Sequence, residues 1–366
     1  MSATAILSKA SHVLLERRAT LAIIVLNRPE ALNALSLDMV REMARFLDAL
    51  EKDATVACVA VKGAGERGLC AGGDIRTLYD SALRADGWPE VFWAEEYALN
   101  ARIASFPKPY VAVMDGIVMG GGVGISAHAR HRIVTERTKV AMPEVGIGLI
   151  PDVGGSWLLS RPRGEAGTCL ALTGMTIGAG DAIHAGLAGS YIPSTKLDAV
   201  AEALARLPAG AGDGEVASLL AAFAEPPPPS RLEEQRAVID GCLSFDTVEE
   251  IQAALVRSDA PFAKEILAAM LSKSPTSLKV TLKLLRLGRA SKGLEECLER
   301  EYRAVLHATA LAADMVEGIR AAVIDKERNP KWCPGRLEDV AEKDVAAFLE
   351  KAPSRPIPFH KDEALT

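Results

Sequence analysis

Short apolar runs that alternate with amphipathic stretches dominate the first 195 residues of this 366-residue chain. Leu21–Leu26 and Val56–Val61 are brief, contain β-branched residues and have the character of buried strands. Residues 37–52 between them carry apolar side chains at helical spacing, and Tyr110–Met114 repeats the strand pattern. Strands separated by helices predict an α/β fold.

The sequence pattern changes after residue 195. From residue 197 onward helical periodicity prevails, interrupted by Pro226–Pro229, which we interpret as a stiff surface spacer. We therefore predict an α/β core over residues 1–195 and a mainly helical region over residues 196–366. We interpret Met1–Leu15 as a short arm that leads into the first strand.

The composition limits the classes of partner. With 49% hydrophobic and 25% charged residues the chain can bury a large core, and a net charge of −6 argues against a nucleic-acid partner. The six cysteines are scattered without a CxxC pair, which favours reduced thiols over disulfides or a metal site. No apolar run approaches the roughly 18 residues of a membrane span, so we expect no membrane partner.

Two carboxylates stand in otherwise apolar, glycine-rich or proline-rich surroundings. Glu144 and Asp152 lie eight residues apart in AMPEVGIGLIPDVGGS, residues 141–156. Burying a charged carboxylate is costly unless it is paired, hydrogen-bonded or protonated, so both are candidates for chemistry. The alternative is that Glu144 caps a turn after Pro143 and Asp152 caps a helix beginning near Val153.

Two glycine clusters precede expected helices. Residues 70–74 read CAGGD, and Gly120–Gly122 is a triple glycine. Small residues allow backbone N–H groups to approach a ligand, and two facing N–H groups form an oxyanion hole for a carbonyl. Residues 122–127 also match a GxGxxA dinucleotide fingerprint with Glu136 as the ribose acid, but residues 115–119 separate these glycines from the preceding strand, which disfavours that alternative.

Four ordered motifs carry a family resemblance: NRP with NAL (residues 27–35), AGGDI (71–75), MDGIVMGGGVGIS (114–126) and AMPEVGIGLIPDVGG (141–155). Together they resemble the crotonase (enoyl-CoA hydratase/isomerase) superfamily. The resemblance implies acyl-CoA substrates, a spiral of ββα turns and an oxyanion hole formed by the N–H groups of Ala71 and Gly121.

The chain departs from the hydratases of that superfamily at one position. Hydratases carry a catalytic glutamate two residues after the triple glycine, where this chain has Gly124, while their second glutamate matches Glu144. Hydration of a double bond is therefore disfavoured.

With EEY (residues 95–97), KPYV (108–111) and NPKW (329–332), the pattern is similar to that of acyl-CoA thioester hydrolases within the superfamily. That similarity implies hydrolysis of a short 3-hydroxyacyl-CoA, the kind of step found in valine breakdown. It also implies Glu144 and Asp152 as catalytic residues and a substrate-contacting set that adds Glu96 and Gly121.

Coenzyme A is expected as part of the substrate, with no separate cofactor and no metal. The resemblance makes Arg28 a candidate for its phosphates and the backbone near Asp74 and Ile75 a candidate for its adenine, with Gly72 and Gly73 as further candidate contacts. Two alternatives stay open: a hydratase or isomerase reaction on another short acyl-CoA, and a non-catalytic acyl-CoA binder. The resemblance also implies a homo-oligomer in the bacterial cytoplasm, or in the mitochondrial matrix of a eukaryote.

Overall fold

The computed structural model describes residues 11–311, 313–350 and 352–359. The chain divides into two compact units, each built from three segments. The first comprises Met1–Gly73, Ala98–Val140 and Ile177–Ser230, and the second comprises Asp74–Tyr97, Ala141–Thr176 and Arg231–Thr366. This division differs from the predicted boundary after residue 195, because residues 177–230 group with the first unit and two earlier segments with the second. Most of the expected N-terminal arm, residues 1–10, lies outside the described residues.

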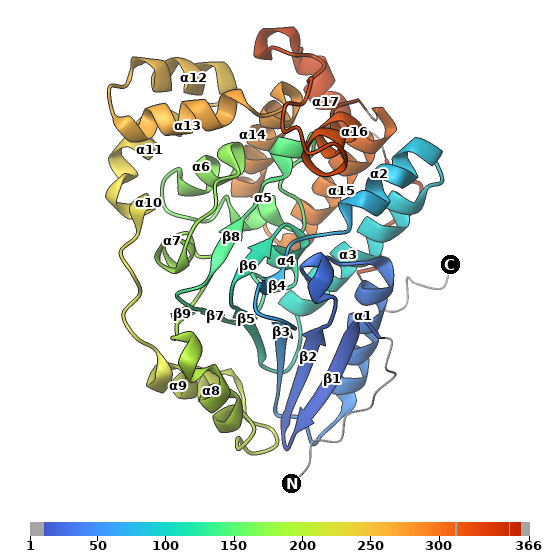
Figure 1. Ribbon diagram of the computed structural model, residues 1–366, viewed down its shortest axis with the longest axis vertical. Helices are drawn as coiled ribbons and strands as arrows, with labels where there is room; N and C mark the ends of the chain where they lie inside the picture. Colours follow the sequence, from blue (N-terminus) through green and yellow to red (C-terminus); the bar gives the residue numbers. More distant parts are fainter. Residues whose placement is uncertain (1–10, 312, 351, 360–366) are drawn as a thin grey trace. The chain divides into compact units, whose positions relative to one another are not determined.

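A six-stranded sheet lies in the first unit, in the order β1-β2-β3-β5-β7-β9 (Figure 1). Its strands are β1 (Val13–Arg18), β2 (Leu21–Leu26), β3 (Cys58–Gly63), β5 (Tyr110–Met114), β7 (His131–Val134) and β9 (Ser190–Tyr191). β1 is antiparallel to β2, and the later neighbours pair in parallel, so each of those steps needs a crossover connection. The prediction missed β1, because its sequence VLLERR lacks the continuous apolar run of β2.

A smaller sheet has the order β4-β6-β8 and contains β4 (Gly68–Cys70), β6 (Ile117–Met119) and β8 (Lys139–Ala141). Successive strands alternate between the two sheets: β4 follows β3 along the chain, β6 follows β5 and β8 follows β7. This repetition of two strands per turn, with helices in the connections, confirms the predicted α/β spiral of ββα turns.

Apolar side chains of the large sheet form the core of the first unit. One cluster joins strand residues with α8 (Leu197–Leu204) and α9 (Asp213–Phe223); it includes Leu21, Ile23, Ala60, Val111, Ile133, Val200, Leu204, Val216 and Leu220. Helix α1 (Leu37–Lys52) packs on β1 and β2 and begins at Ser36, whose side chain accepts the N–H of Met39. The first unit also contains η1 (Pro29–Ala31), α4 (Gly121–Gly124), α7 (Ala179–His184) and η3 (Ser194–Lys196).

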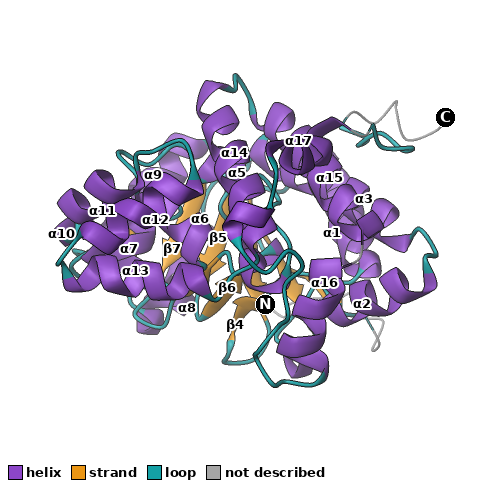
Figure 2. Cartoon of the chain, turned by 90° about the horizontal axis from the view of Figure 1, so that it is seen from above, coloured by secondary structure: helices purple, strands orange, loops and turns teal. Residues whose placement is uncertain are grey.

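The second unit is mainly helical. Its elements are α2 (Ile75–Arg84), η2 (Glu144–Ile147), α5 (Gly155–Leu158), α6 (Ala166–Thr173), α10 (Arg231–Glu234), α11 (Arg236–Leu243), α12 (Val248–Arg257), α13 (Pro261–Leu271), α14 (Pro275–Ala290), α15 (Leu294–Leu311), α16 (Ala313–Ile319), η4 (Arg320–Ile324), η5 (Leu337–Asp339) and α17 (Glu342–Glu350). Helices α11, α12 and α13 pack together, as Figure 2 shows. Helix α3 (Trp88–Ala104) begins in this unit, and the division falls within it after Tyr97.

Two helices are shorter than predicted, and both follow glycines. The helix expected after Gly120–Gly122 and the one expected to begin near Val153 are the single turns α4 and α5. Val153 and Gly154 have φ values of 51° and 84°, which lie outside the helical region and delay the start of α5. Among the helices of the described ranges, none is both long and apolar enough to cross a membrane.

Candidate active site

Three predicted carboxylates lie together in the second unit. Glu96 is on α3, Glu144 is the first residue of η2, and Asp152 is in the loop before α5. These residues are only 2%, 7% and 8% exposed. The charge of Asp152 raises the pKa of both glutamates, which is the effect of like charges held close to one another.

Local sequence sets the backbone around Glu144 and Asp152. Pro143 precedes η2, and Gly148, at a φ of 74°, ends it by donating its N–H to the Glu144 carbonyl oxygen. No side chain caps η2, and the residue preceding α5 is Gly154, again without a side-chain cap. The alternative that Glu144 and Asp152 are only caps is therefore wrong.

Burial controls the ionisation of the cluster. It raises the pKa of Glu96 and of Glu144 well above the usual value, with the charge of Asp152 as the second cause. Burial also raises the pKa of Asp152, to about 6, although a hydrogen bond from Tyr97 opposes the rise. A cluster that holds protons near neutral pH can exchange one with a bound substrate.

Two oxygens of the cluster lack partners. Oε1 of Glu96 and Oε2 of Glu144 are buried and have no hydrogen bond to any of the residues that the structure describes. Buried polar atoms are normally satisfied, so such an atom marks a place where a ligand or water can bind. Glu96 and Glu144 thus each have a buried oxygen that is open to a ligand or water.

Asp152 is held by an aromatic side chain. The hydroxyl of Tyr97 donates a hydrogen bond of 2.7 Å to its Oδ2. The Tyr97 ring meets the ring of Tyr302 edge-on, with centroids 6.0 Å apart. Tyr97 is completely buried.

A fourth carboxylate, Glu301 of α15, is 0% exposed and was not among the predicted site residues. Its oxygens accept the N–H groups of Gly154 and Ser156, each at 2.7 Å, and the Ser156 hydroxyl at 2.5 Å. Burial raises the pKa of Glu301 to about 8, while these hydrogen bonds oppose the rise. The available signal was its spacing: Glu301 lies four residues from both Cys297 and Val305, on the buried face of the helix.

The two glycine loops approach each other within the first unit. A Cβ atom at Gly72 would lie 3.8 Å from the Gly121 nitrogen, and one at Gly122 would lie 2.3 Å from the Cys70 carbonyl oxygen. Gly72 has a φ of 112° and Gly120 one of 49°, conformations that favour glycine. The backbone conformation therefore explains the glycine at residue 72, and close packing against Cys70 explains the one at residue 122.

The structure corrects one predicted donor. The N–H of Ala71 donates to the carbonyl oxygen of Leu32 at 3.0 Å, so it is not available to a substrate carbonyl. The N–H of Gly72 is directed to the Cys70 sulfur at 3.4 Å. Within the described ranges, the next N–H, that of Gly73, has no acceptor, and neither has that of Gly121. Gly73 and Gly121 are thus the donors that these loops can offer.

Gly124 lies in the first unit, at the end of α4, and is buried. It has no side chain that could move a proton, so the second acid/base group of a hydratase is missing at this position. The dinucleotide alternative is also wrong, because α4 ends after four residues. Glu136, its ribose acid, instead accepts the N–H of Ser194 at 3.0 Å and the Ser194 hydroxyl.

The candidate residues for coenzyme A already have structural contacts. An Arg28 side-chain nitrogen donates to the Ala34 carbonyl oxygen at 3.3 Å. Asp74 caps α2 by accepting the N–H of Thr77 at 3.2 Å, and Ile75 is the first residue of that helix. Arg28, Gly72 and Gly73 belong to the first unit, whereas Asp74 and Ile75 begin a segment of the second.

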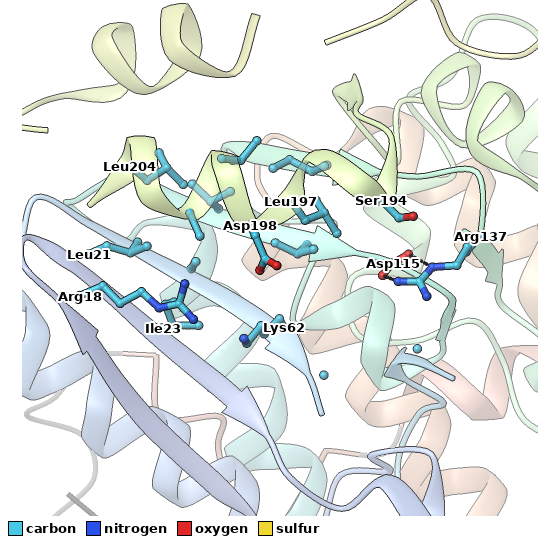
Figure 3. A pocket seen from close by; sticks show the side chains of 18 of the residues that line it. Arg18, Leu21, Ile23, Lys62, Asp115, Arg137, Ser194, Leu197, Asp198 and Leu204 are labelled. Carbon is cyan, nitrogen blue, oxygen red and sulfur yellow. Dashed lines mark hydrogen bonds and ion pairs between the residues drawn. The ribbon is translucent and has the colours of Figure 1, made fainter. Parts of the chain in front are cut away.

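A cavity of about 360 Å³ in the first unit contains none of the predicted site residues (Figure 3). It lies between the large sheet and α8, and it is lined by apolar residues that include Leu21, Ile23 and Leu204 and by the charged Arg18 and Asp198. Among the described residues, no group of three histidine, cysteine or acidic side chains is arranged to hold a metal ion.

Comparison with known proteins identifies the relatives of this chain. The profile of the Enoyl-CoA hydratase/isomerase family matches residues 21–349. The mitochondrial 3-hydroxyisobutyryl-CoA hydrolase of Rattus norvegicus is 41% identical over 96% of this chain and 92% of its own length.

Two solved structures are similar over most of their length. A protein from Mycobacterium thermoresistibile described as a carnitinyl-CoA dehydratase is 46% identical, with a TM-score of 0.89, over 96% of this chain and 99% of its own. An enoyl-CoA hydratase from Rhodobacter sphaeroides 2.4.1 is 42% identical, with a TM-score of 0.86, over 93% of this chain and 97% of its own. Together with the matching family profile, these similarities show that the chain belongs to the enoyl-CoA hydratase/isomerase family.

Proposed function

We propose that this protein is an acyl-CoA thioester hydrolase that converts 3-hydroxyisobutyryl-CoA to the free hydroxy acid and coenzyme A, as in valine catabolism. The observation that carries the proposal is the buried pair Glu144 and Asp152, with raised pKa values, in a chain that has Gly124 at the position of the second hydratase glutamate. The substrate named for the hydrolase of Rattus norvegicus supports it.

In the proposed reaction, the N–H groups of Gly73 and Gly121 donate to the thioester oxygen. Each such donor contributes roughly 3 kcal/mol to stabilising the oxyanion of the transition state. Glu144 has a buried oxygen without a partner among the described residues and is the base that takes a proton from water. The water oxygen then bonds to the carbonyl carbon, the carbon–sulfur bond breaks, and the thiolate of coenzyme A receives the proton.

A second route uses the same residue as a nucleophile. The Glu144 carboxylate attacks the carbonyl carbon, and the carbon–sulfur bond breaks to release coenzyme A as the thiolate. Water then opens the mixed anhydride to the hydroxy acid and the Glu144 carboxylate, and the proton set free goes to the thiolate. A single turnover in ¹⁸O-labelled water separates the routes. Label in Glu144 requires the anhydride, opened by water at the Glu144 carbonyl, whereas general-base catalysis puts label only in the released acid.

Asp152 and Glu96 are proposed to bind the 3-hydroxyl group and the reacting water. If the buried carboxylates hydrogen-bond to the 3-hydroxyl group, an analogue without this group leaves them unpaired. The transition state of such an analogue is then bound less tightly. We therefore expect isobutyryl-CoA to be hydrolysed at least about 100-fold less efficiently than its 3-hydroxy counterpart. Comparison with 3-hydroxypropionyl-CoA tests how far the branch methyl matters.

The alternative is a hydratase or dehydratase reaction, as the descriptions of the two similar structures suggest. Adding water across a double bond needs one group to activate the water and a second to protonate carbon, and Gly124 supplies neither. A non-catalytic acyl-CoA binder would have no need for four buried carboxylates, whose burial raises their pKa values.

Coenzyme A enters this proposal only as part of the substrate, with no further cofactor. Arg28 remains the proposed contact for its phosphates, and the backbone near Asp74 and Ile75 the proposed contact for its adenine. A homo-oligomer also stays a proposal. For location, the hydrolase of Rattus norvegicus is described as mitochondrial, while the two similar structures come from bacteria. We propose the bacterial cytoplasm, or the mitochondrial matrix if the source is a eukaryote.

The decisive experiment is a thiol-release assay with 3-hydroxyisobutyryl-CoA, run beside a hydration assay with crotonyl-CoA. We expect coenzyme A release from the first substrate and no loss of the enoyl absorbance from the second. Glu144→Gln should lower the release rate by about 10³-fold. Hydration of crotonyl-CoA without thiol release would refute the hydrolase proposal, and so would a Glu144→Gln variant that keeps near wild-type turnover.

A further inference from the structure

Glu301 is a buried carboxylate to which the proposed mechanism assigns no task. It lies near the middle of α15 among the buried residues Cys297, Leu298, Tyr302 and Val305. A carboxylate in an apolar face of a helix is unfavourable unless it is fully hydrogen-bonded. Its contacts therefore indicate its role.

All the hydrogen bonds of Glu301 go to the segment that follows Asp152. Oε2 accepts the N–H of Gly154 and Oε1 accepts the N–H of Ser156, each at 2.7 Å, while Oε1 also accepts the Ser156 hydroxyl. Backbone N–H groups can only donate, so both oxygens of Glu301 must accept. One side chain thus holds two backbone positions that lie two and four residues beyond Asp152.

The segment so held is a strained turn. The N–H of Gly155 donates to the carbonyl oxygen of Asp152 at 2.7 Å, and the two central residues, Val153 and Gly154, have φ values of 51° and 84°. These values correspond to a type I′ turn, in which asparagine and glycine are preferred. A β-branched residue in the left-handed region is an outlier that persists only when its surroundings enforce it.

We propose that Glu301 is a positioning residue that enforces this turn and thereby fixes Asp152 in its working geometry. The inference rests on the proposed function, since it deepens the role of Asp152 there. Without the two anchored N–H groups, the turn around Val153 relaxes toward conformations with negative φ. Asp152 then loses its alignment with the Tyr97 hydroxyl, while Glu144 on η2 keeps its own backbone hydrogen bonds.

The test replaces Glu301 by glutamine. Glutamine has the same shape but only one acceptor oxygen, so its amide nitrogen must face one of the two N–H groups. Ser156→Ala is the matched control, because it removes the hydroxyl and keeps both N–H anchors. Glu165→Gln controls for stability: Glu165 is another buried carboxylate of the second unit, and it is bound instead to Thr168, Arg286 and Arg289.

Two readouts are measured: kcat and KM for coenzyme A release, and amide hydrogen exchange over residues 150–158 by mass spectrometry. In Glu301→Gln we expect kcat to fall roughly 10- to 100-fold with a smaller change in KM, because a displaced catalytic group affects the reacting geometry. Exchange over residues 150–158 should become faster. Ser156→Ala should change kcat less than about threefold, and Glu165→Gln should lower the melting temperature without altering this exchange.

A Glu301→Gln enzyme with unchanged kcat and unchanged exchange overturns the inference. It is overturned equally if Glu165→Gln has the same effects as Glu301→Gln, namely an equal loss of melting temperature, an equal fall in kcat and equally faster exchange over residues 150–158. If the wild-type protein releases no coenzyme A, the proposed function fails and the exchange data alone decide. Faster exchange confined to Glu301→Gln then supports the proposal that Glu301 enforces the turn, and equal exchange in all variants refutes it.

Discussion

The hydroxyl of Tyr97 donates a hydrogen bond of 2.7 Å to Oδ2 of Asp152, and both residues are buried. This hydrogen bond lowers the pKa of Asp152 against the larger effect of burial, which leaves the pKa at about 6. The pKa values of Glu96 and Glu144 are raised well above the usual value. Tyr97 thus favours the ionised form of Asp152, whereas burial favours the protonated forms of Glu96 and Glu144.

Tyr97→Phe should raise the pKa of Asp152 and slow the reaction. Removing the hydroxyl leaves a buried carboxylate oxygen without its donor, which costs about 1–3 kcal/mol. We expect a lower free energy of unfolding in urea and an acid limb of kcat/KM displaced to higher pH. The matched control is Tyr110→Phe, because the buried Tyr110 hydroxyl has no partner among the described residues. Equal effects of the two substitutions would contradict the assigned role of Tyr97.

Glu144 should give the hydrolysis a marked pH dependence. As base or nucleophile it must be ionised, and burial followed by the charge of Asp152 raises its pKa. We expect log(kcat/KM) to rise with a slope of about one through an apparent pKa well above 4.5, the usual value for glutamate. In Asp152→Asn this limb should move to lower pH, because one neighbouring negative charge is gone. An acid limb that stays in place in this variant would show that Asp152 does not act on Glu144.

Stability should change with pH in the opposite sense to the usual surface carboxylate. The pKa of Asp152 is raised from 3.8 to about 6 on folding, so its contribution to stability is fully present below pH 3.8 and is lost as the pH rises through 6. Asp152→Asn removes that loss. The free energy of unfolding of the variant, relative to that of the wild type, should therefore be higher at pH 7.5 than at pH 4 by at most about 3 kcal/mol. Urea unfolding at the two pH values measures the difference.

Asp86 provides a control of opposite sign for this measurement. Its pKa is lowered, chiefly by the Ser81 hydroxyl and then by the N–H of Trp88. The stability that Asp86 contributes is therefore present above its usual pKa and is lost as the pH falls. Asp86→Asn should destabilise the protein more at pH 7.5 than at pH 4, and a change in the same direction as Asp152→Asn would contradict the assignment.

The strands of the spiral could be predicted where burial leaves a continuous apolar run. Leu21–Leu26 and Tyr110–Met114 are strands at the expected residues, because parallel strands covered on both faces are uniformly apolar. Strand β1 was missed, since five of its six residues are only partly buried and its sequence mixes apolar with charged residues. The division into interleaved units was not predicted either, because it depends on contacts between segments far apart in the sequence.

Glu144 and Asp152 could be singled out from the apolar sequence around them, residues 141–156. The contacts that hold the neighbouring backbone in place could not. Which N–H of the AGG loop is free depends on the hydrogen bond from Ala71 to Leu32, which joins residues 39 positions apart. Glu301 lies about 150 residues from the turn that it holds, and the helical pattern of α15 alone does not reveal that partner. Motif spacing thus singles out candidate side chains but not the long-range contacts that position them.

The approach of the two glycine loops gives a last prediction, on Gly122. A Cβ there would lie 2.3 Å from the Cys70 carbonyl oxygen and 3.1 Å from its carbonyl carbon, and both are backbone atoms that cannot rotate away. Gly122→Ala must therefore push the loop of Gly73 away from that of Gly121, and misaligned oxyanion donors are expected to cost about 10²-fold in kcat.

Gly178→Ala is the matched control, because a Cβ at Gly178 meets no atom within 4 Å and the residue has a φ of −91°. We expect it to leave kcat unchanged and to alter the melting temperature by only a few degrees. Thiol release and thermal melting measure both variants. If Gly122→Ala retains wild-type kcat at a temperature where it is folded, the N–H groups of these loops do not form the oxyanion hole.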